Sequence, residues 1–267
     1  MIVYCTESKY GIQVTQAHHQ NNPSTHATLR TDVPKPPFWV YHALVPLAIA
    51  LPLSIWLMGA GGDLHIASAV YSAEGGHWAL RHAWITAKLI HHGGKNLSIA
   101  GGLFVAIVAL GTRRHRKWAY ISTPASYLFC AVLLSTLIVS LLKHISHMDC
   151  PWDLLMYGGS RPYISLFQSR AGLPASGCFP AGHASAGYAW VASYFACIMI
   201  QPRCRWYAFI ASCVLGGTFG ISQELRGAHF VSHDLWCFMV CWYTALGLYY
   251  VWQKFLIAVP CTLKNTS

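Results

Sequence analysis

Long apolar runs alternate with short polar segments along most of the chain. Runs of about twenty residues with few charges are typical of helices that cross a bilayer. Six such runs cover residues 38–58, 97–111, 118–142, 183–200, 206–222 and 235–257. The pattern therefore predicts an all-α, polytopic membrane protein with six transmembrane helices in a single domain, residues 38–257.

The composition agrees with a membrane protein and argues against a nucleic-acid partner. Of 267 residues, 55% are hydrophobic and only 10% are charged, whereas soluble domains carry about 25% charged residues. The net charge of +10 comes from cations in short loops at the ends of the apolar runs, not from a basic stripe with interleaved aromatic residues. The expected partners are the bilayer and an anionic membrane lipid, with no nucleic acid.

The basic loops predict the orientation, because short loops rich in Lys and Arg remain in the cytoplasm. Such clusters occupy residues 112–117 and 202–205, and six spans place both on the side of the two termini. We expect cytoplasmic tails at residues 1–37 and 258–267, and outer loops at about 59–95 and 143–182. The first loop is too polar to cross and predicts an amphipathic segment on the outer surface. Three cations do not fit this orientation rule, because the same topology places them on the outer side: Arg81, Lys88 and Lys95.

Two polar clusters at span ends suit phosphate binding on the outer face. Lys143 ends the third span, and Pro-Ala-Gly-His at residues 180–183 opens the fourth. A turn into a helix presents backbone N–H groups, here from Ala181 and Gly182, that attract anions. His183 is placed to give a proton to a leaving oxygen. Taken singly, a terminal lysine snorkels and an interfacial histidine forms hydrogen bonds; their combination favours a phosphate site.

A third cluster, after the fifth span, supplies a candidate nucleophile. A histidine can attack phosphorus when an acceptor holds its other ring nitrogen. His229 fits that role, and Arg226 can neutralise the oxygens of the transition state. Two acceptors remain open: His233 lies one helical turn further on the same face, whereas Asp234 is rotated away but carries the better charge. Both are candidate catalytic residues.

Two rival functions predict other patterns. Zinc catalysis needs three protein ligands around an open position, and His144, His147 and Asp149 form one possible set. No His-Glu-x-x-His is present in these clusters, and we expect neither a metal nor a cofactor. A transporter would carry polar residues in mid-span and broken helices in both halves, whereas this chain places its cations and histidines at the outer ends.

The three clusters, in this order, resemble the type 2 phosphatidic acid phosphatase superfamily, whose pattern is Lys-x6-Arg-Pro, Pro-Ser-Gly-His and Ser-Arg-x5-His-x3-Asp. The resemblance covers about residues 137–242, and segments such as Cys150-Pro-Trp-Asp-Leu are similar to a bacterial branch that includes lipid A phosphatases. It implies a metal-independent lipid phosphatase of the bacterial inner membrane with a periplasmic active site. By that mechanism His229 becomes phosphorylated and His183 protonates the leaving group.

The substrate stays open among a lipid A-like molecule, undecaprenyl pyrophosphate and a phospholipid, and a phosphotransferase would use the same intermediate. The motifs also depart from the pattern. Cys150 stands where the first arginine belongs, Ala181 replaces the serine, Gln223 the second arginine and His233 the aspartate. The candidate substrate-binding residues are therefore Lys143, Arg161, Ala181, Gly182, Gln223 and Arg226. Cys150 and Cys178 share the outer loop and are possible disulfide partners in an oxidising compartment.

Overall fold

A computed structural model of the chain describes residues 2–8, 11–17, 36–114, 118–165, 168 and 176–258. These residues are chiefly helical, apart from an antiparallel hairpin of β1 (Ile2–Ser8) and β2 (Gly11–Ala17). The hairpin falls within the predicted polar tail 1–37, where the sequence indicated no strand. Residues 18–35 of that tail, residues 115–117 of the basic loop and nearly all of the predicted C-terminal tail lie outside the described residues.

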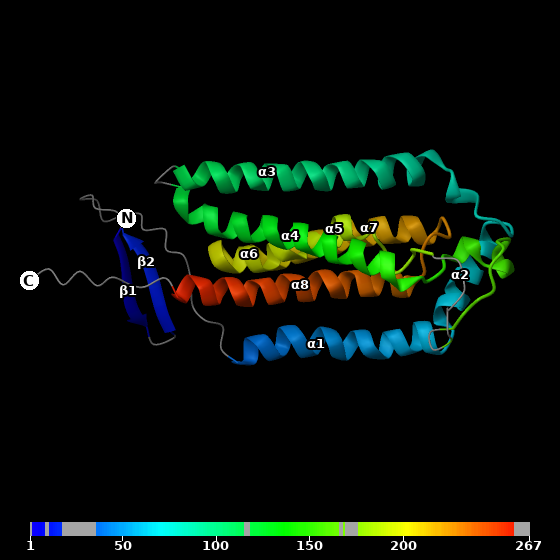
Figure 1. Ribbon diagram of the computed structural model, residues 1–267, viewed down its shortest axis with the longest axis horizontal. Helices are drawn as coiled ribbons and strands as arrows, with labels where there is room; N and C mark the ends of the chain where they lie inside the picture. Colours follow the sequence, from blue (N-terminus) through cyan, green and yellow to red (C-terminus); the bar gives the residue numbers. More distant parts are fainter. Residues whose placement is uncertain are drawn as a thin grey trace, which may run out of the picture.

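The long helices run side by side along the longest axis of the molecule (Figure 1). They are α1 (Pro36–Ser54) continued by a π-turn (Ile55–Gly59), a π-helical segment (Ile85–Gly93) continued by α3 (Gly94–Arg114), α4 (Ala119–Ser146), α7 (Arg205–Glu224) and α8 (Val231–Ala258). A shorter continuous run joins α5 (Ser185–Tyr188), a 3-10 turn (Ala189–Val191) and α6 (Ala192–Ile200).

Five of the predicted spans correspond to helices that are long and apolar enough to cross a membrane, judged by length and composition. They are Pro37–Gly59, Ile85–Arg114, Tyr120–Asp153, Pro202–Glu224 and Val231–Lys254. The fourth predicted span, residues 183–200, is the shorter apolar helix Ser185–Ile200. The chain is therefore a helical protein with several membrane-spanning segments, while the count of six stays a prediction.

The second span is longer than the sequence indicated. Helical structure begins at Ile85 rather than at residue 97, so the predicted outer loop 59–95 is shorter by about ten residues. Within that loop lie α2 (Gly62–Ala73) and a 3-10 turn (Ala79–Arg81). Figure 1 shows α2 lying across the end of the bundle, as expected for a segment that does not cross.

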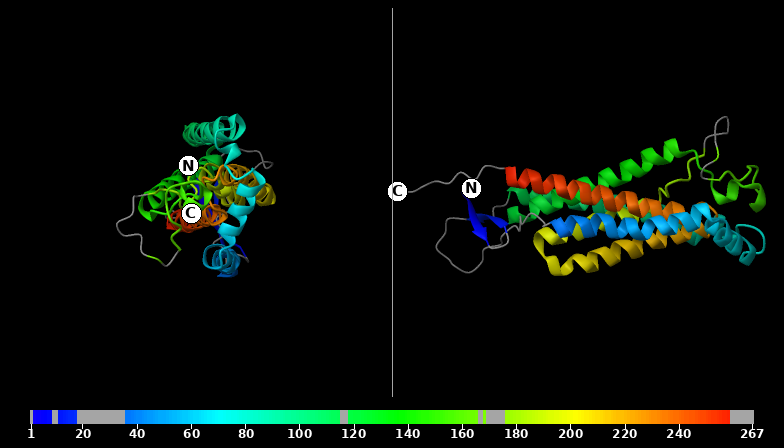
Figure 2. Two further views of the ribbon diagram at one scale, coloured as in Figure 1. Left: turned by 90° about the vertical axis from the view of Figure 1, so that its right-hand side faces the viewer. Right: turned by 90° about the horizontal axis from the view of Figure 1, so that it is seen from below.

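The connections between helices sort to two ends of the bundle (Figures 1 and 2). At one end α1 begins, α8 ends, α3 ends and α4 begins, and the chain turns from α6 into α7. At the other end, which we call the loop end, lie α2, the segment after α4 and the turn between α7 and α8. That segment contains two 3-10 turns, Pro151–Asp153 and Leu155–Tyr157. The three polar clusters thus share the loop end.

An aromatic core joins α4, α6 and α8, whereas the outer faces of the long helices remain apolar and exposed. Tyr127, Phe195 and Tyr249 are almost fully buried, and the Tyr127 hydroxyl donates to the Ala245 carbonyl at 2.8 Å. Large side chains on the outside include Leu103, Tyr207 and Val214, each at least 60% exposed. Apolar exposure along whole helices is expected where a surface faces hydrocarbon.

Candidate active site

His229 lies in the turn between α7 and α8 and is buried, with 4% of its surface exposed. Gly227 makes this turn possible, because its φ of 69° is in the left-handed region and a side chain there would overlap the Trp78 ring. Burial holds the pKa of His229 well below 6.5, and the charges of His233, Lys143 and His183 lower it further. The Cys178 carbonyl, which faces the ring as an acceptor, offsets only part of this shift. The imidazole is therefore neutral near pH 7.

His183 stands beside His229, just before α5. The two ring centroids are 6.3 Å apart, at an angle of 46°. The two histidines come from segments 46 positions apart in the sequence, and both rings can reach one phosphoryl group. His183 also lines the large cavity described below, so it is the more accessible of the two.

His233 and Asp234 point to different neighbours. The His233 ring centroid lies 5.7 Å from that of His229, with Phe179 and Phe230 packed edge-on against it, each at 5.4 Å. The Asp234 carboxyl instead lies against Gly220 on α7, where an added side chain would overlap it, and shares a hydrogen bond with the carboxyl of Glu224. The side chain next to His229 is thus His233.

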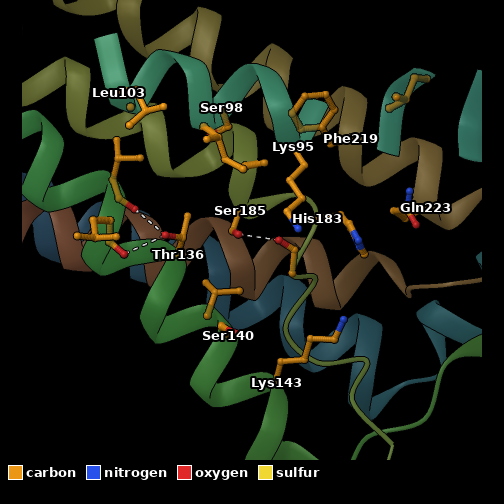
Figure 3. Close-up of a pocket in the computed structure, with 18 of the residues that line it drawn as sticks. Lys95, Ser98, Leu103, Thr136, Ser140, Lys143, His183, Ser185, Phe219 and Gln223 are labelled. Atoms are coloured by element: carbon orange, nitrogen blue, oxygen red, sulfur yellow. Dashed lines mark hydrogen bonds between the residues drawn. The ribbon is translucent and has the colours of Figure 1, made fainter. Parts of the chain in front are cut away.

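A cavity of about 510 Å³ opens between α3, α4 and α5 beside His183 (Figure 3). Its polar end is lined by Lys95, Lys143, Gly182, His183, Ser185 and Gln223. From there it continues along α3 and α4 between apolar side chains, among them Leu103, Phe129 and Leu133. A cationic end joined to an apolar groove suits a molecule with a phosphorylated head and a hydrocarbon chain.

The ligand set that the sequence suggested for zinc does not assemble. Among the residues that the structure describes, one group of three metal-ligating side chains has its ligand atoms close together: Cys150, Asp153 and Cys178. Two of these are joined in a disulfide and cannot act as thiolate ligands. His144, His147 and Asp149 do not form such a group.

The sequence of this chain matches the family model of the PAP2 superfamily over residues 124–257, which is half of the chain. This chain belongs to the PAP2 superfamily. PAP2 membership and the five long apolar helices together make it a multi-pass membrane protein with a lipid phosphatase-like fold.

One solved structure is similar to this PAP2 chain. It is the crystal structure of the first transmembrane PAP2 type phosphatidylglycerolphosphate phosphatase from Bacillus subtilis, at 18% identity and a TM-score of 0.49. The match covers 82% of this chain and 98% of that one. No curated protein sequence matches this chain.

The arginines that the sequence offered in place of the PAP2 motif arginines are engaged with protein groups. Arg161 forms an ion pair with Asp149, Nη1 to Oδ1, at 2.6 Å. Arg226 donates from Nε to the Arg81 carbonyl and from Nη1 to Oε1 of Gln223, both at 3.0 Å. Neither arginine lines the cavity, whereas the buried Gln223 does. Arg226 thus holds the Gln223 amide in place through a hydrogen bond and does not face the cavity itself.

Ala181 is not the phosphate-facing donor that the sequence suggested. Its backbone N–H donates to the His233 carbonyl at 3.1 Å, and the residue is fully buried. That bond ties the second PAP2 motif to the third. Gly182 does line the cavity, with the Lys143 side chain packed closely over it. A Cβ added at position 182 would make ordinary van der Waals contact with that lysine, 3.4 Å from its Cδ.

A disulfide joins Cys150 and Cys178, as the sequence suggested, with Cα atoms 5.3 Å apart. Both cysteines are buried, and the Cys178 N–H donates to the Met148 carbonyl at 3.1 Å. The bridge connects the segment after α4 to the stretch of chain that leads into His183. Because the Cys178 carbonyl faces His229, the disulfide also supports the position of the His229 ring.

Sequence reasoning missed Lys95 and Glu224 as site residues. Lys95 lies near the start of α3, outside the PAP2 match, and counted only as an exception to the topology rule. Glu224 ends α7 with no motif to mark it, and pairs with Asp234. Arg81, a second cation that does not fit the orientation rule, packs its guanidinium over the Trp152 ring at 4.4 Å. A cation beside an apolar run was the one available signal for Lys95.

Proposed function

We propose that this PAP2 protein is a metal-independent lipid phosphatase that hydrolyses a phosphate ester of a membrane lipid through a phosphohistidine intermediate. The observation that carries the proposal is the pairing of buried His229 with His183, which lines the cavity. His229 is buried and neutral, and His183 faces it from the polar end of an apolar groove.

In the first step, a ring nitrogen of neutral His229 attacks phosphorus. The N–P bond forms, the bond between phosphorus and the ester oxygen breaks, and protonated His183 gives its proton to that oxygen. His233 and the Cys178 carbonyl hold the His229 ring in position. Lys143 neutralises charge on the phosphoryl oxygens, and Gln223 adds an amide donor.

In the second step, water attacks the phosphohistidine. The new P–O bond forms as the N–P bond breaks, and neutral His183 accepts a proton from the water. Inorganic phosphate leaves, and both histidines return to their starting protonation states. No step needs a metal, because the charge of the transition state is met by lysine and by hydrogen-bond donors.

We place the site at the periplasmic face of a bacterial inner membrane, with both termini in the cytoplasm. The basic clusters 112–117 and 202–205 support this orientation. The first includes the end of α3 at Arg114 and the second joins α6 to α7, and both of these helix ends lie opposite to the site. The Cys150–Cys178 disulfide at the loop end also fits an oxidising compartment. Alkaline phosphatase fusions after residue 204 should be inactive, and fusions near residue 176 should be active; the reverse result would overturn the orientation.

The activity is tested by phosphate release from detergent-solubilised protein with a chelator present. The substrates are a lipid A-like phosphate, undecaprenyl pyrophosphate, phosphatidylglycerolphosphate and phosphatidic acid. We expect release from at least one, none from a His229→Ala variant, and a ³²P label on protein that is stable to base and labile to acid. Full activity in the His229→Ala variant would contradict the phosphohistidine mechanism. Label that passes to an added acceptor lipid instead of water would identify a phosphotransferase.

A further inference from the structure

The polar end of the cavity holds two lysines rather than the lysine and arginines of the PAP2 motifs. A phosphate monoester carries up to two negative charges, and binding it in a partly apolar site requires cations close by. Arg161 and Arg226 are bound to protein groups and do not line the cavity. Among the residues that the structure describes, the cationic side chains that line it are Lys95 and Lys143.

Lys95 reaches the cavity because the start of α3 is fixed against α7. Gly94 meets the Phe219 ring so closely that any side chain at 94 would overlap it. One turn later Ser98 accepts a hydrogen bond from Nε1 of Trp190 at 3.0 Å, and Gly101 packs on the same indole. These contacts fix the rotation of α3.

In this orientation, the side of α3 that carries Lys95 lines the cavity. Its lining residues are Lys95, Ser98, Ile99, Gly102 and Leu103, which follow the spacing of three and four that marks one side of a helix. Lys95 is the charged residue of this stripe, and it stands at the end nearest His183. The other members are small, polar or apolar and continue into the groove.

The two lysines approach the same histidine from different helices. Figure 3 shows Lys95 extending from α3 and Lys143 from α4, both toward His183 and from opposite sides of the cavity. Gln223 stands at the rim of the same space. A phosphate next to His183 would therefore meet a positive charge on each side.

We infer that Lys95 is a phosphate-binding residue of this enzyme, supplying the second cation that the substituted motif positions no longer provide. This inference rests on the proposed function. It assigns part of the site to α3, which lies outside the PAP2 match. The ligand is the phosphoryl group of the substrate and, equally, the inorganic phosphate product.

The test compares Lys95→Met and Lys95→Gln with Lys95→Arg, using Lys88→Met as the matched control. Lys88 is a neighbouring exposed lysine that does not line the cavity. Two readouts are needed: KM and kcat for the best lipid substrate, and binding of inorganic phosphate to the intact protein by calorimetry. The second readout does not depend on turnover, so it separates the inference from the proposed function. Unchanged melting temperatures confirm that each variant is folded.

We expect Lys95→Met and Lys95→Gln to weaken phosphate binding and raise KM by about tenfold, the order of one charge-assisted contact. Lys95→Arg should stay within about threefold of wild type, and Lys88→Met should change neither value. Phosphate affinity within about twofold of wild type in both neutral variants would overturn the inference, as would an equal loss in Lys88→Met. If wild type binds phosphate through Lys95 but cleaves no lipid, the proposed function fails and the binding site stands.

Discussion

Asp63 on α2 accepts a hydrogen bond from the backbone N–H of Ser232, the second residue of α8, at 3.0 Å. Both residues are buried, although they lie 169 positions apart. The first N–H groups of a helix have no partner within it, so α2 supplies the cap that α8 lacks in its own sequence. Because His233 follows Ser232 directly, this contact also fixes the residue that packs beside His229, the proposed nucleophile.

Replacing Asp63 with alanine should destabilise the fold more than replacing it with asparagine. Asp63→Ala leaves the Ser232 N–H buried without an acceptor, which costs about 1–3 kcal/mol. Asp63→Asn keeps an acceptor oxygen. Melting in detergent would show the difference, and equal melting temperatures for the two variants would contradict the cap.

The same pair predicts a pH effect. Burial raises the pKa of Asp63 above 3.8, and the hydrogen bonds from Ser232 oppose the shift only in part. A folded-state pKa above the unfolded one means that the charged carboxylate is disfavoured in the folded protein. The contribution of Asp63 to the free energy of unfolding therefore falls as pH rises above 3.8. The uncharged amide of the Asp63→Asn variant carries no such penalty. The stability of Asp63→Asn relative to wild type should therefore increase between acid and neutral pH, and a difference in melting temperature that stays constant with pH would contradict the raised pKa.

Activity should persist into mildly acidic solution. His229 must be neutral to attack, and its pKa lies well below 6.5. The acid limb of kcat/KM should therefore fall below pH 6.5. Lys143→Met removes one of the charges that lower this pKa, so the limb of its residual activity should move to higher pH, whereas Lys88→Met should leave it in place. A limb at or above 6.5 in wild type would contradict the burial of His229.

The sequence predicted the bundle well because its strongest signal, long apolar runs, needs no tertiary information. The ends of α1, α7 and α8 lie within a few residues of prediction. The second span was predicted to start too late, because Lys88, His91 and His92 make the π-helical segment Ile85–Gly93 resemble a polar loop in the sequence. When only hydropathy is considered, a helix whose first turns carry several polar residues looks like a surface loop.

At the site, the sequence identified the histidines but not the partners of each side chain. Motif spacing is local, so it predicted His183 and His229, whose rings the structure brings to 6.3 Å of each other. Whether Arg161 met phosphate or Asp149 depended on a loop whose path spacing does not encode. Lys95 stayed hidden because Gly94 and Phe219, 125 positions apart, set the rotation of α3. Such contacts become visible only in three dimensions.

Breaking the disulfide should weaken both the fold and the activity. The bridge closes a loop with a sequence separation of 28, for which the loss of the crosslink corresponds to about 3.6 kcal/mol. Cys150→Ser should lower the melting temperature and reduce kcat, since Cys178 faces His229 through its carbonyl. Cys204→Ser, at an exposed free cysteine at the far end, is the control. Loss of activity by a reductant in wild type but not in Cys150→Ser would agree; equal loss in both would point to another thiol.

The roles of His233 and Asp234 can be separated by substitution, which settles the choice that motif spacing leaves open. Asp234 pairs with Glu224 and lies against Gly220, so Asp234→Asn keeps a hydrogen-bonding partner for Glu224 and should lower kcat less than about tenfold. His233 packs beside His229, so His233→Ala removes the neighbour that orients the nucleophile and should lower kcat by about 100-fold or more. His233→Asn should recover part of this loss if hydrogen bonding matters. Of the two substitutions, only His233→Ala removes a side chain that packs against the His229 ring. A larger loss of kcat in Asp234→Asn than in His233→Ala would therefore contradict this assignment and give the orienting role to the Asp234 carboxylate.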